Sequence, residues 1–129
     1  MRLMLDTRVL LWAATEASRL RASARAALED GENEVLVSAV VGWEIAIKQS
    51  LGKLTLASPA EIWLPDVIRQ AGFELADVTM DAAVGVRGLP WHHKDPFDRL
   101  LIAHARALGA TIVTHDDAFA AYGVPLLEA

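Results

Sequence analysis

Short apolar runs bounded by polar or turn-forming residues recur along this chain and predict buried strands. These runs are RLML at residues 2–5, EVLVS at 34–38 and TIVT at 111–114, with FELADVT at 73–79 expected to be extended and VPLL at 124–127 expected to pair at a sheet edge. The segments between them carry apolar residues at helical spacing, so strands and helices alternate.

Several of the predicted helices carry recognisable end signals. Ser38 is suited to cap a helix that runs to about Leu51, and Asp95 followed by Pro96 opens the clearest helix, which ends near Gly109. The other helices are expected at residues 7–14, 17–29, 59–71, 81–87 and 118–122. Such alternation is typical of an α/β fold with a parallel sheet and right-handed crossovers. Since there is no internal repeat, linker or low-complexity tract, we expect one domain over residues 1–129.

Composition narrows the protein class. A chain of 129 residues that is 53% apolar can bury a continuous core. It has no cysteine, which excludes disulfides, thiolate zinc sites and cysteine nucleophiles and suits a reducing compartment. Asp6 and Arg8 interrupt the apolar amino terminus, which argues against a signal peptide or a membrane span. We therefore expect a soluble cytoplasmic protein that does not enter a membrane.

Four acidic residues stand where a strand ends or on an apolar helix face. Asp6 follows RLML, Glu44 lies within VVGWEIAIK, Asp98 within DPFDRLLIAHA, and Asp116 follows TIVTH. A parallel sheet would gather these positions at one edge. Two unit charges about 4 Å apart repel by about 4 kcal/mol at an effective dielectric constant of about 20. Converging acids therefore predict a site for Mg²⁺ or Mn²⁺, which prefer carboxylate ligands.

Each acid also has a structural interpretation. Asp6 and Asp116 are in positions where a helix N-cap is common, and Asp98 occupies the third helical position, where capping boxes place an acid. Glu44 lies on a stripe that should be buried, so its alternative is a buried ion pair, for example with an arginine. The net charge of −5 argues against a simple basic nucleic-acid binder, although these four acids account for most of it.

The residues around the acids receive lesser roles. We predict that Asp95 is a helix cap, that Asp117 faces solvent and that Thr114 is structural or contacts phosphate or water at the site. Arg99 is expected either to touch phosphate or to lie solvated on its helix. The histidines show no metal-ligand spacing and are given no catalytic role; they are His92, His93, His104 and His115. The tryptophans and methionines are expected mainly in the core.

Four motifs together resemble the PIN-domain nucleases, and within them the VapC-type toxins of VapBC toxin-antitoxin pairs. They are MLDT, SAVVGWEIAIKQSLGKL, HKDPFDRLLIAHA and TIVTHDDAF, and in this order they cover essentially the whole chain. One departure is visible: Val41 stands where similar sequences often have a hydroxyl residue three before the acid, while Ser38 keeps the earlier hydroxyl. This departure affects only a secondary polar contact near Glu44.

The resemblance implies a three-layer α/β/α fold whose central parallel sheet has strand order 3-2-1-4-5. It also implies a Mg²⁺- or Mn²⁺-dependent endoribonuclease, the toxin of a type II pair, that cleaves RNA and is inhibited by a small cognate antitoxin. The acidic set of the family falls on Asp6, Glu44, Asp98 and Asp116, with Asp6 and Asp98 as the principal ligands. The surplus of apolar residues could be covered in a homodimer and by an antitoxin segment.

Three alternatives remain at this point. A receiver-type signalling domain would need a second acid beside Asp6 and a lysine after a late strand, and neither is present. A metal-independent, histidine-based ribonuclease would be insensitive to chelators. An interaction module without catalysis would bind a partner through the surplus of apolar residues alone.

Overall fold

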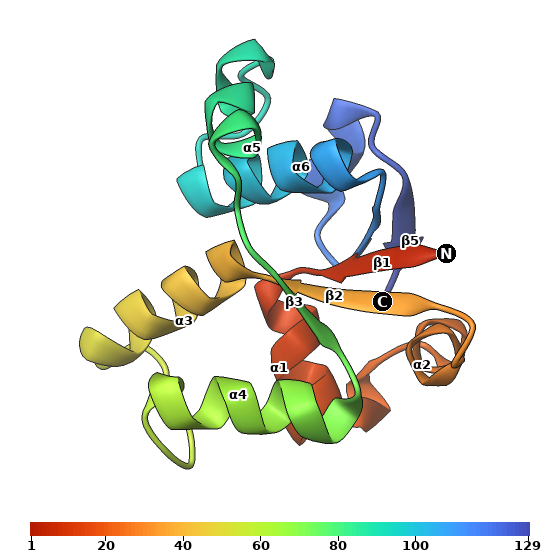
Figure 1. Ribbon diagram of the computed structural model, residues 1–129, viewed down its shortest axis with the longest axis vertical. Coiled ribbons are helices and arrows are strands. Elements are labelled where there is room, and N and C mark those ends of the chain that lie inside the picture. The colour runs from red at the N-terminus through yellow and green to blue at the C-terminus, as the bar shows by residue number, and fades with distance from the viewer.

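A five-stranded parallel sheet forms the centre of the molecule, and the computed structural model describes all residues 1–129 (Figure 1). The strands are β1 (Arg2–Leu5), β2 (Glu34–Ser38), β3 (Glu74–Ala76), β4 (Thr111–Thr114) and β5 (Leu126–Glu128). Their order is β3-β2-β1-β4-β5, and every neighbouring pair is parallel. The predicted fold class and strand order are therefore confirmed.

Helices cover both faces of this sheet, as parallel crossovers require. They are α1 (Thr7–Thr15), α2 (Ala22–Glu29), α3 (Ala39–Ser50), α4 (Ala60–Ala71), α5 (Met80–Val84) and α6 (Pro96–Leu108), with 3₁₀ segments η1 (Ala17–Arg19), η2 (Gly85–Gly88) and η3 (Asp117–Tyr122). In Figure 1, α1 to α4 lie on one side of the sheet and α5 and α6 on the other. None of the helices has the length and apolarity needed to cross a membrane.

The apolar runs of the sequence form the two central strands. Leu3, Met4 and Leu5 of β1 and Ile112 and Val113 of β4 are fully buried. β1 lies between β4 and β2 in the middle of the sheet. Helices cover both faces of the sheet at this position (Figure 1). This double coverage explains why these strands are continuously apolar instead of alternating.

The predicted helix over residues 17–29 is wrong in one respect, because it is two segments. Leu20 and Arg21 are extended, with ψ angles of 145° and 147°, and separate η1 from α2. The Leu20 side chain is buried in the core. In a continuous helix its direction would instead be set by the helical periodicity of the neighbouring apolar residues. The smaller differences are that α4 begins after Pro59, α5 after Thr79, and residues 117–122 are 3₁₀.

The expectation that the tryptophans lie mainly in the core is only half correct. Trp63 is buried and Trp12 is half-buried, whereas Trp43 and Trp91 are 51% and 78% exposed. Of the methionines, Met4 alone belongs to the core. Two large aromatic surfaces are thus left on the outside of the molecule.

A buried polar contact joins α3 to α6. Ser38 caps α3, since its Oγ accepts the Val40 backbone N–H at 3.1 Å, and the same Oγ lies 2.8 Å from Nδ1 of His104 on α6. Burial lowers the pKa of His104, so its ring is held neutral. A neutral ring leaves Nδ1 free to accept the Ser38 hydroxyl proton, and the two helices are held in register at this point.

Replacing this serine should therefore destabilise the fold measurably. Ser38→Ala removes a helix cap and leaves His104 Nδ1 buried without its partner, with an expected loss of about 1–3 kcal/mol in the free energy of unfolding. Urea unfolding followed by circular dichroism measures this loss. The matched control is Ser50→Ala at the exposed end of the same helix, where the hydroxyl donates only to the Ile47 carbonyl. Equal losses in the two variants would contradict the role of the buried contact.

Candidate active site

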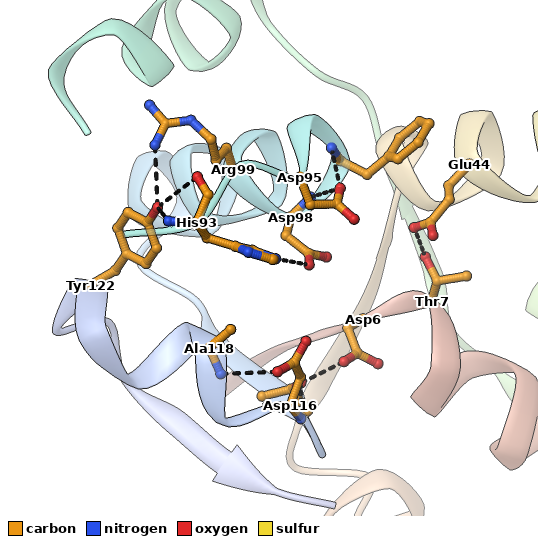
Figure 2. A network of polar contacts seen from close by, with 12 residues as sticks. Asp6, Thr7, Glu44, His93, Asp95, Asp98, Arg99, Asp116, Ala118 and Tyr122 are labelled. Atoms are coloured by element: carbon orange, nitrogen blue, oxygen red, sulfur yellow. Dashed lines mark hydrogen bonds and ion pairs between the residues drawn. The ribbon is translucent and has the colours of Figure 1, made fainter. Parts of the chain in front are cut away.

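A cavity of about 340 Å³ lies at the carboxyl-terminal edge of the sheet and contains all four acids singled out in the sequence. Asp6 and Asp116 follow the neighbouring strands β1 and β4, Glu44 comes from α3 and Asp98 from α6. Figure 2 shows that the carboxylates of Asp6, Asp98 and Asp116 point into a common space, with Glu44 at its far side. The structure thus brings the four together, while their role as metal ligands stays a prediction.

Asp6 is held by two hydrogen bonds at the end of β1. Its Oδ1 accepts the Val9 backbone N–H at 2.8 Å, which caps α1, and its Oδ2 accepts the hydroxyl of Thr114. The Thr114 Oγ1 in turn accepts the Asp116 backbone N–H at 3.0 Å. Burial raises the pKa of Asp6, and the bonds from Thr114 and Val9 oppose that rise. Thr114 is therefore structural and fixes two of the four acids relative to each other.

Glu44 is buried and pairs with a lysine instead of the arginine considered from the sequence. Its Oε1 accepts the Thr7 hydroxyl at 2.6 Å, and its Oε2 forms an ion pair with Lys48, one helical turn along α3. The side chain of Lys48 is 44% exposed, so the ammonium partner of the buried Glu44 carboxylate is in contact with solvent. Glu44 thus has a structural partner and still lines the cavity.

Asp98 is aimed into the cavity by the start of α6. Asp95 is the cap of this helix, as predicted, because its Oδ1 accepts the backbone N–H groups of Phe97 and Asp98 at 2.8 and 3.2 Å. The Asp98 carboxylate is free of capping, and its Oδ2 lies 2.8 Å from Nε2 of His93. Burial raises the pKa of Asp98 to about 6, against the opposing hydrogen bond from His93. An acid with such a pKa is typical of a functional site.

His93 belongs to this site, which corrects the prediction that no histidine contributes. His93, Asp98 and Asp116 each offer one ligand atom, and these atoms lie within 4.8 Å of one another. The backbone N–H of His93 donates to the Tyr122 hydroxyl at 2.9 Å, which anchors the loop that carries the ring. The sequence offered only one signal, the position of His93 two residues before the Asp95 cap.

The remaining residues near the cavity fall into two groups. His115 lines the cavity, as do the basic residues Arg8, Lys48 and Lys53. Asp117 is exposed and faces solvent, as predicted, while His92 packs edge-on against Tyr122 outside the cavity. The cavity therefore contains acids at the sheet edge and cationic groups on the side of α1 and α3.

Arg99 is buried, and both interpretations offered from the sequence are wrong. The residue is 5% exposed, and its guanidinium donates to three backbone carbonyls of the segment before α6 and to the Tyr122 hydroxyl. The carbonyls belong to Val86, Leu89 and Pro90. The ring of Trp91 covers the guanidinium at 3.8 Å. Arg99 thus fixes the loop that ends in His93, and Figure 2 shows it on the side of α6 away from the acids.

Removing the donors of Arg99 should accordingly affect stability. Arg99→Met keeps much of the side-chain length but leaves buried carbonyls without partners, with an expected loss of about 2–4 kcal/mol in the free energy of unfolding. Chemical denaturation measures it. Arg106→Met is the matched control, because this exposed arginine of the same helix donates to a single carbonyl, that of Tyr122. A loss no larger than in the control would contradict the bracing role.

The raised pKa of Asp98 also gives a pH-dependent prediction. The value rises from 3.8 to about 6 on folding, so the folded state binds the proton more tightly. The resulting stability is complete below about pH 4 and is lost as the pH rises through about 6. In EDTA, Asp98→Asn should therefore be more stable than the wild type above pH 6, on the order of 1–2 kcal/mol once solvent screening is allowed for, and no more stable below pH 4.

Thermal denaturation from pH 4 to pH 8 measures this difference. Asp117→Asn, which alters an exposed acid outside the cavity, is the control and should show no gain of this kind. A gain for Asp98→Asn that is the same at every pH would show that the cause is packing and not charge.

Comparison with known protein families agrees with this architecture. A model of the PIN domain family matches residues 3–125 of the chain. Over 48 residues the chain is 44% identical to ribonuclease VapC16 of Mycobacterium tuberculosis, a match that covers 37% of this chain and 34% of that protein. The chain therefore matches about a third of the length of that relative.

Solved structures with the same fold align over nearly the whole chain. VapBC2 from Rickettsia felis, bound to a DNA fragment from their promoter, aligns with a TM-score of 0.75 and 19% identity, covering 99% of this chain and 98% of that one. DNA-bound VapBC from Salmonella typhimurium aligns with a TM-score of 0.69 and 19% identity over the same shares. At these identities the likeness establishes a common fold.

Proposed function

This chain belongs to the PIN domain family, and on that basis we propose that it is a VapC-type endoribonuclease that depends on Mg²⁺ or Mn²⁺. The observation that carries the proposal is the convergence of Asp6, Glu44, Asp98 and Asp116 on one cavity. The partial match to a protein described as ribonuclease VapC16 supports the choice of RNA as the substrate. The hydrolysed bond would be a phosphodiester of the RNA backbone.

The donor set of the cavity fits a divalent cation. Its oxygen donors are the carboxylates of Asp6, Glu44, Asp98 and Asp116, while Asp95, which also lines the cavity, caps α6. Asp6, Asp98 and Asp116 would hold the cation, with Glu44 completing the acidic lining. Because His93 Nε2 lies 2.8 Å from Asp98 Oδ2, His93 would orient this carboxylate and would not itself bind the cation. When bound, the cation would lower the pKa of a water molecule and neutralise charge that develops on the phosphodiester.

The protein supplies positioning around that chemistry. Thr114 keeps Asp6 and Asp116 at a fixed separation, and His93 fixes the rotamer of Asp98 through its contact with Oδ2. The raised pKa values of Asp6 and Asp98 mean that both carboxylates hold protons more readily than free acids. A bound cation would favour the ionised forms of both carboxylates, which the contacts with Thr114 and His93 already hold in place. Fixed groups of this kind lower the cost of organising the reaction.

We also propose a small antitoxin partner and a homodimer. The structural neighbours described as VapBC support a partner protein for this chain. The exposed Trp43, whose ring packs edge-on against Phe97 at a centroid distance of 4.8 Å, is an apolar surface that a second copy would bury. The antitoxin partner and the homodimer do not depend on the catalytic proposal.

A metal-independent ribonuclease is the second candidate, because two histidines approach the cavity. His93 contacts Asp98, and His115 lines the cavity wall. A pair of imidazoles can act as general base and acid without a cation. The receiver-type alternative is weaker, since the lysines of the cavity come from α3 and the residues just after it, and none follows β4.

The deciding experiment measures RNA cleavage by the purified chain with Mn²⁺, with Mg²⁺ and with EDTA. A panel of structured and unstructured RNAs serves as substrate. Asp6→Asn keeps a helix cap but removes a carboxylate, and we expect it to lower the cleavage rate by about a hundredfold or more. EDTA should abolish cleavage in the wild type.

Asp117→Asn is the matched control, since it removes one negative charge next to Asp116 but outside the cavity. It should cleave at the wild-type rate, and all variants should show unchanged circular dichroism. Cleavage that persists both in EDTA and in Asp6→Asn would refute the metal mechanism and favour the histidines.

A further inference from the structure

A row of basic and aromatic side chains leads away from the acidic cavity along α1. Its members are Arg8, Trp12, Arg19 and His115, which we call the α1 strip. Arg8 and His115 line the cavity itself. Trp12 lies one helical turn beyond Arg8 on the same face of α1. The strip therefore begins at the acids and continues outward to Arg19.

Trp12 backs two exposed planar groups. The ring of His115 packs against it at a centroid distance of 5.5 Å and an interplanar angle of 60°, and the guanidinium of Arg19 lies 5.0 Å from its ring centroid. Trp12 is half-buried, whereas Arg19 and His115 are exposed. The tryptophan thus serves as a fixed support, and the imidazole and guanidinium are the surfaces that a ligand would meet.

The two arginines of the strip are available to bind an anion. The side chain of Arg8 is exposed and has no ion-pair partner. Arg19 has only a 3.8 Å approach to Glu16, and both side chains are more than half exposed, so that pair contributes little. On a chain of net charge −5, Arg8 without an ion pair and Arg19 with only a weak one place two cationic groups beside the acidic cavity.

We propose that the α1 strip binds single-stranded RNA that runs into the acidic cavity. Arg8 and Arg19 contact phosphates, and unstacked bases lie against the His115 ring and the Arg19 guanidinium. Bases stack in this way on aromatic rings and on guanidinium planes, and such stacking tolerates many sequences. A duplex would offer phosphates but no base faces. The inference rests on the proposed function, since it supplies the substrate subsite of that cavity.

Arg8, Arg19 and His115 are contact residues in this arrangement, and Trp12 is a positioning residue. Trp12 acts by holding the Arg19 guanidinium and the edge-on His115 ring in place, so Phe at this position should conserve the effect that Leu removes. This difference separates positioning from simple bulk, because leucine also fills apolar space.

The test is the binding of a dye-labelled single-stranded oligoribonucleotide to the full chain in EDTA, followed by fluorescence anisotropy at several salt concentrations. We expect Arg8→Gln and Arg19→Gln each to reduce the slope of log Kd against log salt by about 0.7, the contribution of one phosphate contact. Trp12→Leu should weaken binding by about fivefold or more, and Trp12→Phe should restore most of it. An RNA duplex of the same sequence should show no loss with Trp12→Leu.

The matched control is Arg69→Gln on α4. Like Arg19, Arg69 is exposed and pairs with an acid three residues before it, Asp66. It should leave both the affinity and the salt slope unchanged. The proposal is overturned if the wild type does not bind the oligoribonucleotide, if the slopes of the Arg8 and Arg19 variants equal that of the control, or if Trp12→Leu weakens duplex binding equally.

Binding in EDTA does not depend on cleavage, so the two proposals fail separately. If cleavage depends on metal but the strip variants bind the oligoribonucleotide as the wild type does, only the RNA-binding role of the α1 strip is refuted. Binding with the expected slopes, but no cleavage with any cation, would refute the nuclease assignment alone.

Discussion

Carboxylates from two adjacent strands and two helices share one cavity, and the cost of bringing like charges together governs the structure around them. Three of the four acids have a side-chain partner within the protein, and Asp116 accepts the Ala118 backbone N–H. Glu44 has the ammonium group of Lys48, Asp98 has the ring of His93, and Asp6 has the hydroxyl of Thr114. Burial raises the pKa values of Asp6 and Asp98 because it removes the carboxylates from water, and neighbouring acids add a smaller rise. A divalent cation would offset both this burial cost and the repulsion between the acids, and without a cation the ionised acids lower the stability of the fold.

The fold was largely predictable because its central strands are continuously apolar and its helices carry clear end signals. Ser38 and Asp95 do cap α3 and α6, and Gly109 ends α6 at a φ of 62°. The break at Leu20 was not predictable, since helical spacing continues through it and only the packing of that side chain into the core interrupts the helix. The strand order came from family resemblance and not from the periodicity, which fixes elements but not their neighbours.

The site was predictable only for residues whose own position in the sequence is unusual. Acids at strand ends or on an apolar helix stripe are anomalies that can be read from the sequence, and all four reach one cavity. His93 was missed because its contact with Asp98 depends on how a loop turns back. Arg99 was misassigned for a related reason: periodicity gives the face of a helix, but the loop that covers that face is known only from the fold. Such contacts require the tertiary structure.

Net charge is a poor guide to what this molecule binds. The chain is negative overall, and five of its 17 acidic residues line one cavity, where they face one another. On the α1 and α3 side of the same cavity, Arg8 and Lys53 have no acidic partner, and the Lys48 ion pair is half open to solvent. A phosphodiester chain would therefore meet cationic groups along its approach and acids only at the reacting position, where a cation reverses the sign of the field. Cationic groups beside the acids of a single cavity would allow an acidic protein to hold an acidic substrate.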